Sequence, residues 1–242
     1  MVPERPPEAN PVLPIASIDD PRAIQLLSTE HWSLLSARAL AYNEAFVRAG
    51  MFLTFLSMSF VALALLAQAM SFGRDFLSVA ALVLAFDLVI GLTTFMRING
   101  TGYDDLRAVH GMARIRHAYT QISPLVEPYF TTPTHDDIDA VVTVYGPPTT
   151  SVWGQLGYGL STSNGMVGMI VSMLGGVLTT VIAMLVGVDG SASIWIGVVT
   201  GIVILAALFA LTASAIVREQ GKFPASFPTP APDPDPMPEP ES

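Results

Sequence analysis

Four long apolar runs dominate the hydrophobic pattern of the chain, at residues 49–70, 76–96, 166–186 and 194–217. Each run has 21 to 24 residues, and a helix of that length covers about 31–36 Å. The hydrocarbon core of a bilayer is about 30 Å thick, and buried helices of soluble proteins rarely run so far without a charge. The pattern therefore predicts an all-α membrane protein with four transmembrane helices.

A helical pattern also precedes the first apolar run. Asp20 and Pro21 are typical of an N-cap followed by the first helical position. Apolar side chains then recur at three- and four-residue steps on one face: Trp32, Leu35, Ala39, Tyr42 and Phe46. Residues 18–48 are therefore predicted to form an amphipathic helix that can continue into the first span. We interpret its apolar face as a packing or interfacial face, with a groove for a partner helix as the alternative.

The remaining segments divide the chain further. Residues 49–97 and 166–217 are predicted as two transmembrane hairpins, and 98–165 as a helical and interfacial segment between them. Within that segment we expect a helix over 102–122, a short helix with Thr134 as its N-cap, and a loop over 146–165 at the lipid head groups. Residues 1–17 and 218–242 are rich in proline and are predicted to be disordered.

The distribution of basic residues predicts the topology. Arginines flank the outer ends of the two hairpins, whereas the connection between spans one and two offers only Arg74, and that between spans three and four offers none. The positive-inside rule then places both termini and residues 98–165 in the cytoplasm. A single lysine, with abundant Ala, Val and Gly, is typical of a GC-rich bacterial genome, so we expect the bacterial inner membrane.

Composition and motifs narrow the chemistry. The chain has no cysteine, which excludes disulfides, thiolate metal sites and cysteine nucleophiles. It contains no GxSxG elbow, phosphate loop, HExxH motif or dinucleotide fingerprint. We therefore expect a non-enzymatic protein with no cofactor, no bound metal and no nucleic-acid partner. Asp136 and Asp139 are the best candidates for a divalent cation site, but acidic residues at a helix start need no metal.

Four basic residues in the 102–122 helix follow at steps of three and four: Arg107, His110, Arg114 and His117. Such a stripe can contact anionic lipid head groups, each cation contributing about 1 kcal/mol near the surface. The alternative is a solvated face that only fixes the topology.

Each apolar run also carries a stripe of small or polar residues, the pattern through which helices associate in lipid. In the first span the stripe comprises Thr54, Ser57, Val61, Ala64 and Gln68. In the other spans the expected packing positions include Gly91, Gly168, Gly175, Gly176, Gly197 and Gly201. We expect the four stripes to face each other in a four-helix bundle.

Asp87 lies in the middle of the second span. A central aspartate costs about 3 kcal/mol, and twelve Leu, Ile, Phe and Val residues return about 4–7 kcal/mol, so the span should still insert. Aligning the first hairpin by its ends places Asp87 level with Ser59 and near Ser57, with Ser172 and Gln68 as the other polar candidates within the spans. No span offers a cation, so we expect a neutral carboxyl that bonds to hydroxyl groups.

Two functions fit this sequence. In the first, the chain is a structural or accessory subunit, or a scaffold, of a membrane assembly, and Asp87 is a polar link between helices. In the second, it is a small oligomeric ion or proton channel that uses Asp87. The expected partners are the lipid bilayer and either further copies of the chain or other subunits of a membrane complex.

Overall fold

The computed structural model describes residues 17–145, 151–220 and 224–230, and these contain helices and no strand. Two very long helices come first, α1 (Pro21–Met70) and α2 (Arg74–Ile122). The 3-10 helix η1 (Pro124–Tyr129), α3 (Ile138–Val142) and the 3-10 helix η2 (Thr143–Tyr145) follow. The chain then forms α4 (Val152–Ser161), α5 (Ser163–Val186) and α6 (Gly190–Gln220).

Four of these helices are long and apolar enough to cross a membrane: α1, α2, α5 and α6. The prediction of an all-α protein with four candidate transmembrane helices is therefore confirmed at that level. The apolar half of the molecule is formed by residues 49–96, α5 and α6. Large apolar side chains on its outer surface, such as Leu65, Leu82 and Ile202, are each more than 60% exposed, which suits contact with lipid.

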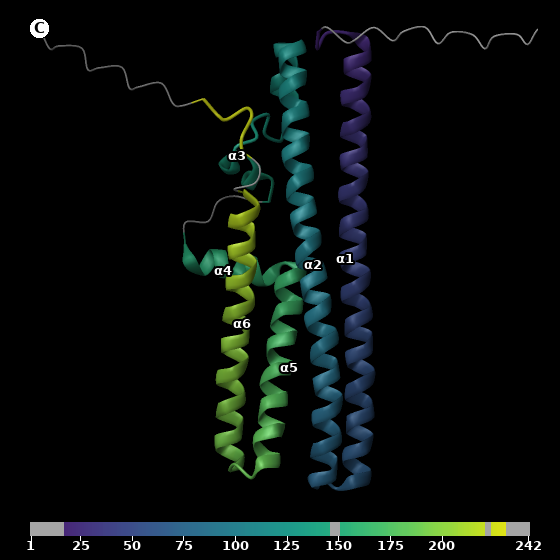
Figure 1. The fold of residues 1–242 in the computed structure, drawn as a ribbon, viewed down its shortest axis with the longest axis vertical. Helices are drawn as coiled ribbons and strands as arrows, with labels where there is room; N and C mark the ends of the chain where they lie inside the picture. The colour runs from purple at the N-terminus through teal and green to yellow at the C-terminus, as the bar shows by residue number, and fades with distance from the viewer. Residues whose placement is uncertain (1–16, 146–150, 221–223, 231–242) are drawn as a thin grey trace, which may run out of the picture.

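Helix α1 is continuous across the predicted boundary at residue 48. Asp20 accepts a hydrogen bond from the Arg22 amide at 2.9 Å and Pro21 begins the helix, while the helix ends where Ser71 adopts a left-handed conformation with φ of 52°. Its 50 residues span about 75 Å. Helix α2 is equally unbroken, so residues 21–48 and 98–122 form a two-helix stalk that extends beyond the apolar half (Figure 1).

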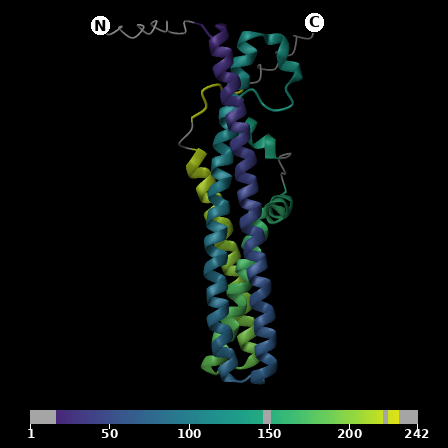
Figure 2. The same ribbon diagram turned by 90° about the vertical axis from the view of Figure 1, so that its right-hand side faces the viewer.

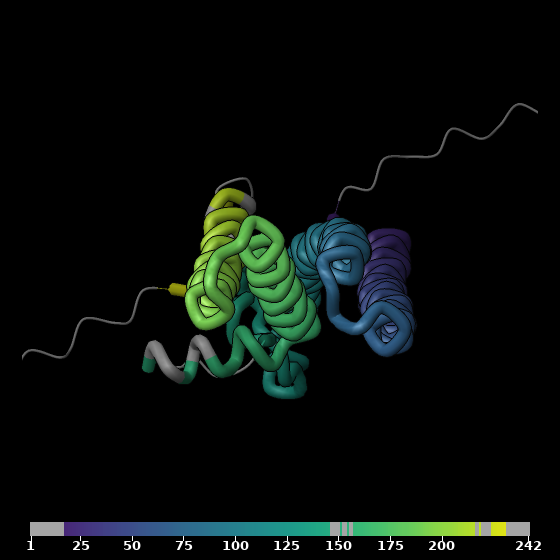
Figure 3. The backbone as a smooth tube through the Cα atoms, turned by 90° about the horizontal axis from the view of Figure 1, so that it is seen from below, coloured from purple at the N-terminus to yellow at the C-terminus, as the bar shows by residue number. Residues whose placement is uncertain are grey.

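The long helices pack in a row. Close contacts join α1 to α2, α2 to α5 and α5 to α6, and the view along the molecule shows α1 and α6 at opposite ends (Figure 3). In the four-helix bundle that we predicted, the four stripes would face each other, whereas here the helices lie side by side in the order α1, α2, α5, α6. The core lies between α1, α2 and α5 and contains Phe52, Leu84, Val171 and other buried side chains.

The stripe predicted for the first span faces outward, contrary to expectation. All five of its residues are exposed: Thr54, Ser57, Val61, Ala64 and Gln68. The inner face of α1 carries Ala49, Phe52, Leu56 and Leu63 instead. Thr54 and Ser57 donate their hydroxyl hydrogens to carbonyl oxygens four residues back on α1, so neither needs a partner on another helix.

The segment between the two hairpins is more structured than predicted. Residues 151–161, expected to belong to a loop, include α4, which runs across the long axis in Figure 1 and is seen end-on in Figure 2. The short helix α3 starts at Ile138 with Asp137 as its N-cap, not Thr134. Thr162 caps α5 by accepting from the Gly165 amide at 3.0 Å, so α5 begins three residues before the predicted span.

Candidate functional site

Asp87 lies on α2 and is fully buried. The Ser59 hydroxyl donates to its Oδ1 at 2.9 Å, and Oδ2 has no hydrogen-bond partner among the described residues. The other polar candidates lie elsewhere: Ser57 and Gln68 are exposed on α1, and buried Ser172 donates to the Gly168 carbonyl at 2.7 Å. The structure thus brings Asp87 together with Ser59 alone of these residues.

The six glycines expected at packing positions all lie where helices come close. A Cβ on Gly91 would approach Val171 at 2.8 Å, and one on Gly176 would approach the Gly197 carbonyl oxygen at 2.7 Å. The same applies to the remaining members of the set, Gly168, Gly175, Gly197 and Gly201, which face side chains or backbone of a neighbouring helix. These residues hold α2, α5 and α6 together, and α5 and α6 meet at glycine backbones.

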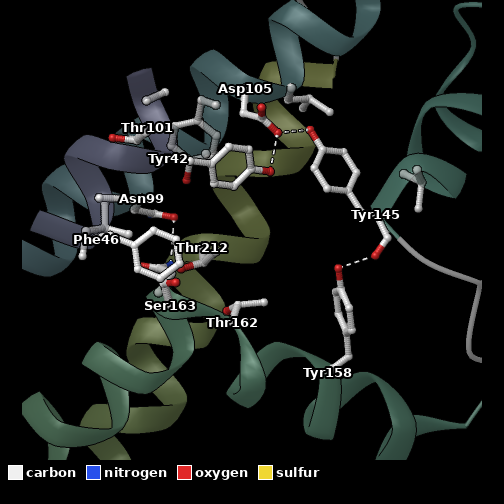
Figure 4. Close-up of a pocket in the computed structure, with 18 residues that line it drawn as sticks. Tyr42, Phe46, Asn99, Thr101, Asp105, Tyr145, Tyr158, Thr162, Ser163 and Thr212 are labelled. Carbon is white, nitrogen blue, oxygen red and sulfur yellow. Dashed lines mark hydrogen bonds between the residues drawn. The ribbon is translucent and has the colours of Figure 1, made fainter. Parts of the chain in front are cut away.

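A cluster of four polar residues joins the elements of the stalk, and we call it the hub: Arg38, Tyr42, Asp105 and Tyr145. Arg38 Nε donates to Asp105 at 2.5 Å, while the hydroxyls of Tyr42 and Tyr145 donate to the same carboxylate at 3.1 and 2.7 Å. Figure 4 shows both tyrosine rings pointing toward Asp105. The hub thereby connects α1, α2 and η2 at one carboxylate.

The electrostatics of the hub follow from burial and charge. The Asp105 side chain is only 5% exposed. Burial alone would lower the pKa of Arg38, but its hydrogen bond to Asp105 and the charge of that carboxylate raise it. Burial, followed by the hydrogen bond to Asp105, raises the pKa of Tyr145 far above its ordinary range. Burial also raises the pKa of Tyr42, so Arg38 and the two tyrosines keep their protons near neutral pH and the hub acts as a fixed tie.

A cavity of about 420 Å³ adjoins the hub at the junction of the stalk with the apolar half. Its wall includes Tyr42 and Asp105 of the hub, Tyr158 from α4, Asn164 from α5 and Thr212 from α6. The Tyr158 hydroxyl points to the backbone carbonyl of Tyr145 and donates a hydrogen bond to it (Figure 4). Helix α4 is thus tied to the hub across this cavity.

The four basic residues of the predicted stripe do not share one environment. His110 is buried, where desolvation lowers its pKa. Arg114 binds Asp136 through Nε at 2.6 Å, and the His117 ring stacks on Phe227 with centroids 4.1 Å apart. Arg107 is the most exposed of the set and lies 3.4 Å from Asp104. Contact of these residues with lipid head groups stays a prediction.

Residues 224–230, predicted to belong to a disordered tail, instead lie against the stalk, and we call them the strap. The buried carboxylate of Asp136 accepts hydrogen bonds from the amides of Ser226 at 2.9 Å and Phe227 at 2.7 Å. Arg114 donates to the Pro224 carbonyl at 3.0 Å, and the neighbouring Asp137 accepts from Thr229. The strap therefore connects the chain beyond α6 to α2 and to the loop before α3.

The same contacts bear on the candidate cation site. Burial would raise the pKa of Asp136, but the amides of Ser226 and Phe227 together with Arg114 lower it. Asp139 is exposed on α3, and no group of three potential metal ligands occurs among the described residues. Both oxygens of Asp136 are engaged by donors from the protein.

Sequence reasoning did not identify the hub or the strap. One signal for the hub was present, because Asp105, Ala108, Val109 and Met112 follow at steps of three, one and three on the buried side of α2. A carboxylate on such a face requires partners. The strap left no comparable signal, since its amides are recognised by a carboxylate about 90 residues away.

No protein-family model, no curated protein and no solved structure matches this chain.

Proposed function

We propose that this chain is a non-enzymatic, multi-pass protein of the bacterial inner membrane that serves as a scaffold or accessory subunit of a membrane assembly. Its four helices anchor it, and the stalk presents a binding surface in the cytoplasm. Arg38, Arg48, Arg97 and Arg107 lie at or beyond the stalk end of the apolar half, which supports cytoplasmic termini through the positive-inside rule.

One observation carries this proposal: the stalk has an apolar face that no other described part of the chain covers. Trp32 and Phe46 are each 65% exposed, and Leu35 and Tyr42 between them are also exposed. With Ala39, which is also exposed, these positions follow in steps of three and four, the spacing with which helices pair. The neighbouring face of α1, whose positions come one residue earlier in the sequence, packs on α2. The exposed face therefore fits a partner helix, from a second copy or from another subunit.

Rigidity supports the same role. Helices α1 and α2 run without interruption from the apolar half into the stalk. The hub and the strap tie the stalk to η2 and to the chain beyond α6. A partner bound at the stalk is therefore held at a fixed position relative to the membrane. These contacts fix the position of the stalk relative to the apolar half, and a scaffold requires such a fixed arrangement.

The experiment is purification of the full chain in mild detergent, with its assembly state and co-purifying proteins determined by native mass spectrometry. Replacing Trp32 and Phe46 together by serine should abolish the assembly. The control replaces Leu125 and Tyr129, which are 82% and 83% exposed but belong to η1 and not to α1, and should leave the assembly intact. A monomer without partners, or equal effects of both variants, would overturn the proposal.

The unpartnered Oδ2 of buried Asp87 favours one second candidate, an ion or proton channel formed by an oligomer. Asp87→Asn keeps the hydrogen-bonding capacity and removes the charge. If proteoliposomes with the native chain carry a proton or cation flux and the variant assembles but loses it, the channel replaces the scaffold as the function. If neither protein carries a flux, Asp87 acts as a link between α1 and α2.

A further inference from the structure

The cavity beside the hub has the size of a small-molecule site. Its volume is about 420 Å³, within the range of about 300–1,000 Å³ that is common for ligand pockets. Apolar side chains from both stalk helices form much of its wall, among them Ala45, Phe46 and Ile98. A ligand for this cavity therefore needs an apolar portion.

The wall is also electrically neutral as a whole. Among the described residues that line the cavity, Asp105 is the only acidic or basic one, and Arg38 lies 2.5 Å from its carboxylate. The remaining polar groups are hydroxyls and two amides, those of Asn99 and Asn164. An anionic head group would find no free cation here, and a cationic one would compete with Arg38. The cavity thus selects an uncharged polar group.

The two amides leave a hydrogen-bonding group unsatisfied. Asn164 Nδ2 donates to Asn99 Oδ1 at 3.3 Å, and Asn164 Oδ1 is buried with no hydrogen-bond partner among the described residues. Turning both amide groups by half a turn would exchange each oxygen with its nitrogen, so that donor and acceptor change places, and would again leave one polar atom unpaired. Such an atom costs about 1–3 kcal/mol. A hydroxyl group of a ligand, which both donates and accepts, satisfies it in either arrangement.

The depth of the cavity identifies the source of the ligand. Asn99 lies three residues beyond the apolar run of α2, Asn164 lies in the first turn of α5, and Thr212 lies near the end of the apolar part of α6. The cavity is therefore at the level of the lipid head groups, where tyrosines such as Tyr158 are typical. Helix α4 crosses the molecule at this level (Figure 1).

We propose that the cavity binds a neutral membrane lipid with a free hydroxyl, of the diacylglycerol class. The hydroxyl lies at the Asn99–Asn164 pair, and the adjoining hydrocarbon packs against Ala45, Phe46 and Ile98. This site borders the exposed face of α1 to which the proposed scaffold function is assigned, because Tyr42 and Phe46 belong to both, whereas Gly102 and the Asn99–Asn164 pair belong to the cavity alone.

The test uses the full chain in nanodiscs of phosphatidylcholine with a photoactivatable, clickable diacylglycerol. Crosslinks should map to residues 41–46 and 98–106, and unlabelled diacylglycerol should compete. A phosphatidic acid probe with the same chains, which carries a charged phosphate in place of the hydroxyl, should label these residues less.

Two glycines of α2 provide a matched pair of variants. Gly102 lines the cavity and Gly100 does not, yet a Cβ at either position meets no atom within 4 Å. Gly102→Leu should fill part of the cavity and lower the labelling at least about tenfold, equivalent to about 1.4 kcal/mol of binding. Gly100→Leu should leave labelling unchanged. Both changes improve helix propensity, so both variants should fold, as unfolding temperatures would verify.

The proposal is overturned if the two leucine variants label equally, if unlabelled diacylglycerol does not compete, or if the phosphatidic acid probe labels the cavity as strongly. Crosslinks confined to the outer surface of α5 and α6 would likewise overturn it. The assembly state of Gly102→Leu, measured in the same samples, should equal that of the native chain. A failure of lipid binding is thereby distinguished from a failure of the scaffold proposal.

Discussion

The hub makes a quantitative prediction for Asp105. Its carboxylate is nearly buried and is shared by Arg38, Tyr42 and Tyr145. Removing one partner of a buried ion pair costs about 3–5 kcal/mol, because the other charge is left without compensation. The Arg38 side chain is 19% exposed and can recover some hydration. We therefore expect Asp105→Ala to lower the free energy of unfolding of the stalk by about 3 kcal/mol, the lower end of that range.

Hydrogen exchange measures this loss in the intact membrane protein. Exchange of the amides in residues 98–122 should accelerate by about two orders of magnitude, since each 1.4 kcal/mol is a factor of ten. Amides in α5 provide the internal reference. Asp104→Ala is the control, because Asp104 is an exposed neighbour with one surface ion pair, to Arg107, and such pairs contribute at most about 1 kcal/mol.

A second variant tests the mechanism as well as the magnitude. Replacing both charges, with Arg38→Met and Asp105→Leu together, leaves no buried ion, so the double variant should be more stable than Asp105→Ala. The reasoning is refuted if Asp105→Ala exchanges at the same rate as Asp104→Ala. It is also refuted if the double variant is less stable than the single one.

Three further predictions concern other parts of the fold. Phe227→Ala removes the histidine stack of the strap and should accelerate exchange of the strap amides about fivefold, for a loss of about 1 kcal/mol. Burial lowers the pKa of His31 and His110 below the ordinary value of 6.5, so the unfolded chain binds more protons than the folded chain below that pH. The stability of the stalk in thermal unfolding should therefore fall as the pH drops below 6.5. This fall should be smaller in a His110→Phe variant. Gly197→Val should separate α5 from α6 and lower the unfolding temperature, with a cost of about 1–3 kcal/mol, whereas Gly190→Val, whose Cβ would meet no atom within 4 Å, should not.

The four helices that are long and apolar enough to cross a membrane could be predicted, because length and apolar content alone determine such segments. The alignment of the first hairpin also placed Asp87 level with Ser59, and the structure joins them by a hydrogen bond. This worked because a tight turn, Ser71 to Gly73, fixes the register of two antiparallel helices. Segments with strong periodicity and short connections are therefore readable from the sequence.

The orientation of α1 could not be predicted, and the reason is physical. The stripe containing Thr54 and Ser57 was expected inside because helices in lipid associate through small residues and through hydroxyls that bond across to a neighbouring helix. Each hydroxyl instead bonds to a carbonyl on its own helix, which removes the cost of facing outward. The fit of side chains determines which face of α1 is buried, with Ala49 and Phe52 packing on α2 and α5. The residue types along α1 do not reveal which face makes that fit.

The hub and the strap depended on contacts between distant segments, and this also explains why the stalk is one unit. Asp105 gathers groups from α1 and η2, and Asp136 gathers an arginine from α2 and amides from the strap. Each carboxylate is buried and would be costly alone, so each requires all of its partners in place. The two clusters together hold α1, α2, α3 and the strap in one arrangement. If a partner binds the exposed face of α1, the hub and the strap hold the stalk beneath it in that arrangement, and removing Asp136 should release the strap from α2 without changing the binding face itself.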